Sequence, residues 1–98
     1  MDLSVLRERI NDIDDQMVRL FVERMQVAAE IAGTKAEKNL PVLDLRREQA
    51  VLQKVMENAG EEFEIYAHKL YQTLFDVSKS YQSGILARET DLSREIKA

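Results

Sequence analysis

The chain has 98 residues and a mass of 11.3 kDa, enough for one domain, and 45% hydrophobic residues make it too apolar to be disordered. Its net charge of -4 argues against a general nucleic-acid binder, because neutralising phosphates requires clustered lysines and arginines. No stretch approaches the ~20 apolar residues of a membrane span, and no basic-then-apolar start indicates a signal peptide. We therefore expect a cytoplasmic domain with neither a membrane nor a nucleic acid as partner.

The composition predicts an all-α fold, since three glycines and one proline leave little material for hairpin turns and good helix formers dominate. A first helix is predicted from about residue 4 to residue 37, where apolar residues recur at steps of three and four. This apolar stripe consists of Leu3, Leu6, Ile10, Ile13, Met17, Leu20, Val27 and Ile31. Asp2 or Ser4 can cap its start.

Two further helices are predicted. The second begins near Asp44 and ends at Gly60, a residue suited to a left-handed C-terminal cap. Acidic Glu61 and Glu62 favour the start of a third helix. Its expected apolar stripe is Phe63, Ala67, Leu70, Leu74, Val77, Tyr81 and Ile85. We assign residues 1–85 to a helical domain and 86–98 to a C-terminal extension, which fits a helix, a frayed tail or a linker equally well.

The predicted first helix is too long for one small domain. It would measure about 50 Å, whereas a compact chain of this size has a radius of gyration near ~13 Å. The second and third helices, expected to be much shorter, cannot cover its whole apolar stripe. Burial against a second copy is the economical solution, so we expect a homodimer with paired long helices.

Charged and polar residues interrupt the expected buried faces of all three helices. Arg24 occupies a stripe position in the first helix, and Lys35 lies about 20° from it around the helix axis. Near the apolar face of the second helix lie Asp44, Arg47 and Glu48, and within an apolar row of the third lie Ser78 and Gln82. Because buried charge is costly unless it is paired or bound by a ligand, these residues indicate a shared polar interior.

Each residue also has a purely structural explanation. Arg24 can snorkel at a packing edge, Lys35 can complement the helix dipole, and Asp44 can cap the second helix. Ser78 can bond a carbonyl four residues back. Taken together, however, the charges on three helices favour a cationic pocket for a small dianionic substrate.

Other chemistries find little support in the sequence. The absence of cysteine excludes a thiol nucleophile, a disulfide framework and Cys-based zinc sites, and the single histidine, His68, is interpreted as a surface residue. There is no glycine-rich phosphate loop and no Glu-x-x-His motif of a di-iron bundle. We therefore expect no metal and no cofactor, and a reaction that needs only positioning and electrostatics.

The arrangement of these residues resembles the all-α chorismate mutases over roughly residues 3–85. The matching positions are Leu6-Arg7-Glu8-Arg9-Ile10, Asp14, Glu23-Arg24, Ala28, Lys35, Pro41-Val42, Asp44-Leu45-x-Arg47-Glu48, Ser78 and Gln82. The resemblance implies a cofactor-free isomerase that converts chorismate to prephenate by a Claisen rearrangement, toward phenylalanine and tyrosine. It also implies an intertwined homodimer with two sites.

The resemblance further implies a role for each site residue. Lys35 and Gln82 would donate hydrogen bonds to the ether oxygen of the breaking bond, where negative charge grows in the transition state. Arg24 would clamp a carboxylate within its own protomer, and Arg7 would reach into the partner's site. Substrate binding would also involve Glu48 as acceptor for the ring hydroxyl, Ser78 beside the ring carboxylate, and Asp44 and Arg47 nearby. Since a neutral amide donates at every pH, the rate should be nearly flat between about pH 5.5 and 8.

Two alternative functions stay open at this point. The first is isochorismate pyruvate-lyase, an enzyme with a similar fold and pocket. The second is a non-catalytic dimeric helical module, in which the interior charges would set the register of the helices or the choice of partner. The region from Leu74 onward is also similar to mutase domains fused to prephenate dehydratase. Both a free-standing enzyme and a fused domain are compatible with the sequence.

Overall fold

A computed structural model describes the backbone of residues 2–97 and the side chains of residues 2–85. These residues form three helices, α1 (Leu3–Glu37), α2 (Leu45–Ala59) and α3 (Glu64–Lys97), and include no strand. The predicted all-α fold and the bounds of the first two helices are confirmed. The expected shortness of the third helix is wrong, because Gly84 does not interrupt it and α3 has 34 residues against 35 in α1.

The helix ends are set by local hydrogen bonds. The Asp2 carboxylate accepts from the Ser4 backbone N–H at 3.1 Å, and the hydrogen bonds from the Ser4 backbone and hydroxyl lower the pKa of Asp2. Asp44 caps α2 in the same way by accepting from the Arg47 N–H at 3.1 Å. The helix ends at Gly60, whose φ of 83° lies in the left-handed region, as predicted for this glycine.

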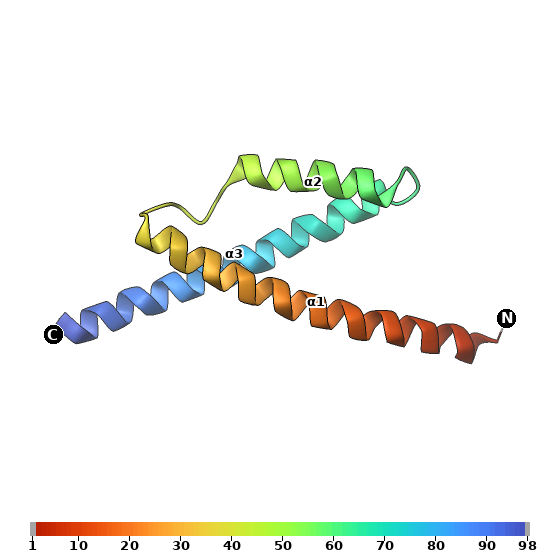
Figure 1. Ribbon diagram of the computed structural model, residues 1–98, viewed down its shortest axis with the longest axis horizontal. Coiled ribbons are helices and arrows are strands. Elements are labelled where there is room, and N and C mark those ends of the chain that lie inside the picture. The colour runs from red at the N-terminus through yellow and green to blue at the C-terminus, as the bar shows by residue number, and fades with distance from the viewer. Residues whose placement is uncertain (1, 98) are drawn as a thin grey trace.

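The arrangement is elongated and centred on α3. Figure 1 shows α1 and α3 crossing, with α2 lying along the N-terminal half of α3. Among the described residues α3 packs against both other helices, whereas α1 and α2 do not pack against each other. The radius of gyration is 17.8 Å and the molecule measures 65 × 29 × 15 Å, well beyond the ~13 Å radius of a compact chain of this length.

The buried residues lie where α1 and α3 cross. Ala28 and Ala32 of α1 are small enough to admit the backbone of α3 closely, and they face a row on α3 that contains Phe75, Ser78 and Gln82. The apolar stripe expected for α3 is not its buried face, since Phe63, Leu70, Val77 and Tyr81 are all exposed. The row that carries Ser78 and Gln82 packs inward, as expected for these two residues.

The N-terminal part of α1 has no packing neighbour within the described chain. All side chains from residue 2 to residue 23 are exposed, and they include the large apolar ones of the predicted stripe. Figure 1 shows this segment projecting away from α2 and α3. No described helix combines the length and the apolar character needed to cross a membrane.

Candidate active site

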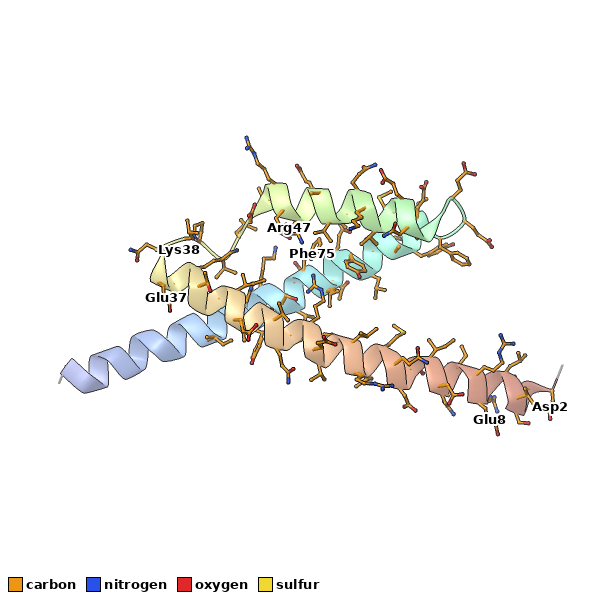
Figure 2. The ribbon with its side chains drawn as sticks, in the orientation of Figure 1. Asp2, Glu8, Glu37, Lys38, Arg47 and Phe75 are labelled. Carbon is orange, nitrogen blue, oxygen red and sulfur yellow. The ribbon has the colours of Figure 1, made fainter. Side chains whose placement is uncertain are left out.

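A cavity of about 290 Å³ lies between the three helices, and each of them contributes to its wall. Its lining combines an apolar floor with charged and amide groups: Arg24, Val27, Ala28, Ile31, Lys35, Val42, Asp44, Arg47, Glu48, Val51, Phe75, Ser78, Lys79 and Gln82. In Figure 2 the labelled Arg47 of α2 and Phe75 of α3 lie at the space that these two helices enclose. This volume is near the lower end of the range for small-molecule sites.

Seven of the eight predicted site residues lie around this cavity, and Arg7 is the exception. Arg7 is exposed on the projecting segment of α1, seventeen residues and so about 25 Å along the helix from Arg24. Figure 2 shows the neighbouring Glu8 at the far end of α1, remote from Phe75. Within one chain, Arg7 therefore takes no part in the cavity.

Arg24 is held in place by two groups on α3. Its guanidinium donates to the Ser78 hydroxyl at 2.9 Å and lies 5.9 Å from the centre of the Phe75 ring. The Ser78 hydroxyl in turn lies 3.9 Å from the Met25 sulfur, so the back-bond to its own helix considered for Ser78 is not formed. A guanidinium carries five N–H donors, and one bond to Ser78 leaves others for a ligand carboxylate.

Lys35 and Gln82 are positioned by backbone carbonyls. The Lys35 ammonium donates to the Val42 carbonyl at 2.8 Å, which ties the α1–α2 connection to the end of α1. The Gln82 amide nitrogen donates to the Ala28 carbonyl at 3.0 Å across the helix crossing. Each nitrogen has more than one N–H, so both groups can donate to a bound molecule while keeping these bonds.

Lys79 is a cavity residue that the sequence reasoning missed. Its ammonium lies 3.1 Å from Oε1 of Glu48, while the other carboxylate oxygen, Oε2, is buried without a hydrogen-bond partner. Lys79 shares one face of α3 with Phe75, Ser78 and Gln82, at spacings of three and four residues. Its position one turn from Phe75 and from Gln82 was the available signal in the sequence.

The cavity wall carries more positive than negative charge. Arg24, Lys35, Arg47 and Lys79 face two carboxylates, Asp44 and Glu48, although the whole chain has a net charge of -4. The Asp44 carboxylate is already engaged as the α2 cap. Such a site suits a small dianion and offers donors fixed before the ligand arrives. Among the described residues, no three His, Asp or Glu side chains gather as metal ligands would.

Several known proteins are similar in sequence to most of this chain. The bifunctional chorismate mutase/prephenate dehydratase of Buchnera aphidicola subsp. Acyrthosiphon pisum (strain APS) is 30% identical over 99 residues, which cover 98% of this chain and 26% of the relative. The protein of the same name from Escherichia coli (strain K12) is 30% identical over 87 residues, covering 86% of this chain and 22% of the relative. The chain thus spans about a quarter of the length of these relatives.

A shorter relative matches along most of both chains. The chorismate mutase of Methanocaldococcus jannaschii is 27% identical over 89 residues, covering 86% of this chain and 87% of the relative. Residues 6–83 match the family described as chorismate mutase type II, a span that includes every residue of the cavity wall. The chain therefore belongs to the chorismate mutase type II family.

Proposed function

We propose that the chain catalyses the Claisen rearrangement of chorismate to prephenate, as an intramolecular isomerase in the synthesis of aromatic amino acids. The observation that carries this proposal is the cavity in which Arg24, Lys35 and Gln82 present fixed donors from two crossing helices. A pericyclic reaction requires neither a nucleophile nor a cofactor, so positioning and electrostatics are sufficient.

Binding would depend on the two carboxylates of the substrate. Arg24, oriented by Ser78 and Phe75, has the geometry to clamp one of them with paired N–H groups. Ser78 would contact the ring carboxylate, and Arg47 would add positive charge from α2. Because Arg24 is already held before binding, little side-chain entropy would be lost on association.

Catalysis would come from Lys35 and Gln82. As the carbon–oxygen bond of chorismate breaks, negative charge grows on the ether oxygen, so donors at that atom stabilise the transition state more than the bound substrate. The carbonyls of Val42 and Ala28 each occupy one N–H of these groups and thereby limit their motion. Glu48 would accept from the ring hydroxyl, and Asp44 would hold the start of α2 in place.

The site would be completed by a second copy of the chain. The exposed apolar stripe on the projecting segment of α1 supports an intertwined homodimer, because a patch of this kind is rarely left in water. In that assembly Arg7 of one chain would reach the cavity of its partner and supply the second carboxylate clamp. This accounts for the one predicted site residue that lies far from the cavity of its own chain.

We further propose that residues 1–85 form the mutase unit, that residues 86–98 are an extension of it, and that the protein acts in the cytoplasm. Some relatives are named bifunctional chorismate mutase/prephenate dehydratase and another is named chorismate mutase. The unit is therefore compatible with a fused enzyme as well as with a free-standing one.

The test is turnover by the purified chain. Chorismate should disappear with stoichiometric formation of prephenate, while isochorismate incubated in parallel should release no pyruvate above the uncatalysed rate. Pyruvate from isochorismate without prephenate from chorismate would assign the lyase activity instead. Turnover of neither substrate would favour a non-catalytic dimeric module and overturn the proposal.

A further inference from the structure

We propose that Lys79 is a positioning residue of this site, which holds the Glu48 carboxylate in the orientation in which it accepts from the substrate hydroxyl. This inference rests on the proposed function and adds to it a residue outside the set that the sequence indicated. It starts from the one ion pair in the described part of the cavity wall, between Lys79 and Glu48.

The two oxygens of Glu48 have different surroundings. Oε1 accepts from the Lys79 ammonium at 3.1 Å, whereas Oε2 is shielded from water and has no hydrogen-bond partner. Because water does not reach Oε2, a ligand hydroxyl does not reach it in this arrangement either, whereas Oε1 has a further lone pair beside Lys79 and can accept a second donor. The bond from Lys79 therefore fixes the position of the Glu48 oxygen that can accept from a ligand.

Lys79 has a second acidic neighbour, Asp76, and their contact is typical of a solvent-exposed ion pair. Its distance to Asp76 is 3.9 Å and the Asp76 side chain is 79% exposed, so that contact is weak and screened. The Glu48 side chain is only 20% exposed, and the contact is shorter. Lys79 therefore interacts mainly across the gap between α3 and α2, and only weakly along its own helix.

The ion pair between Lys79 and Glu48 also reduces the repulsion between Glu48 and an anionic substrate. A dianion entering the cavity would meet the Glu48 carboxylate, and repulsion between like charges in a partly buried site is strong. The Lys79 ammonium offsets this negative charge locally and fixes the Glu48 side chain in one orientation. Lys79 thereby allows a carboxylate to serve as acceptor in a site for an anion.

The substitution Lys79→Met tests this role, because methionine keeps most of the chain length and loses the charge. We expect kcat/KM for chorismate to fall about 10- to 100-fold, the range of a lost hydrogen bond to a charged group. Lys79→Arg, which keeps the charge, should retain most of the activity. Lys69→Met, an exposed lysine on the same helix and outside the cavity, is the matched control and should leave it unchanged.

A double-mutant cycle distinguishes positioning from a general structural role. If Lys79 acts through Glu48, Lys79→Met should cost little further activity in a Glu48→Gln background. Equal losses in both backgrounds, or an unchanged kcat/KM in Lys79→Met itself, would overturn the inference while the proposed function stands. Failure of the unmodified chain to convert chorismate would instead overturn the proposed function and this inference with it.

Discussion

The two halves of α1 have similar amphipathic patterns but very different surroundings. From Arg24 onward the helix crosses α3, buries Ala28 and Ala32, and lines a cavity. Before Arg24 every described side chain is exposed, although apolar residues recur at the same spacing. The same apolar spacing thus occurs in a segment that packs within the chain and in one that does not, so periodicity alone does not identify what covers the face of a helix.

The largest expected effect lies in the half that lines the cavity. Arg24→Ala should lower kcat/KM for chorismate about 1,000-fold, because it removes a charge-assisted clamp from a preorganised site. Steady-state kinetics would measure the loss, and circular dichroism would verify that the helices persist. The matched control is Arg46→Ala, an exposed arginine on α2 outside the cavity wall, which should keep full activity. Equal losses of activity in Arg24→Ala and Arg46→Ala would contradict a specific role for Arg24 in the cavity.

A substitution in the projecting half of α1 should change the oligomeric state of the chain. Ile13→Asp places a carboxylate in the middle of the exposed apolar stripe, and burying it in a dimer would cost about 3 kcal/mol or more per chain. Sedimentation should show dimers of the unmodified chain and monomers of the variant at micromolar concentration. Asp15→Asn, which lies on the opposite side of the helix, should leave the dimer intact. A dimer that survives Ile13→Asp would place the interface elsewhere.

A subtler effect is expected at the helix crossing. Gln82→Glu replaces an amide nitrogen, which has one N–H for the Ala28 carbonyl and one for the ether oxygen, with a carboxyl group. A carboxyl group can donate to the ether oxygen only when it is protonated. The rate of this variant should fall about 100-fold between pH 5 and pH 8, whereas the unmodified chain should stay nearly flat from about pH 5.5 to 8. A pH–rate profile that is the same for both proteins would show that Gln82 does not donate in the reaction.

The smallest effect concerns the start of α1. The folded chain holds the pKa of Asp2 below its ordinary value of 3.8, so its cap contributes stability above that pH and loses it as the pH falls through the folded value. Asp2→Ala should therefore lower the thermal midpoint slightly at pH 6 and not at pH 2. A difference that persists at pH 2 would mean that the capping carboxylate is not its cause.

Local signals in the sequence predicted the helices well. Asp44 and Gly60 act as caps where their residue types indicated, because capping depends on a few neighbouring residues. The convergence of polar groups from three helices was also predictable, because charged residues are rarely placed on the apolar face of a helix unless they are paired or bind a ligand.

Contacts between helices were not predictable in the same way. The bond of Gln82 to the Ala28 carbonyl and the pair of Lys79 with Glu48 join residues far apart in the sequence. They depend on how each helix is rotated at the crossing, which spacing alone does not determine. The same uncertainty led to the wrong buried face for α3, where an apolar row and a polar row compete.

The central claim is that the two halves of α1 meet in one site, each from a different chain, and subunit mixing tests it most directly. Arg7→Ala and Arg24→Ala should each be nearly inactive with chorismate. When equal amounts are unfolded together and refolded, half of the dimers should be hybrids, each with one complete site, which gives about a quarter of the activity of the unmodified protein. A mixture that stays as inactive as its components, although hybrid dimers are shown to form, would contradict the shared site.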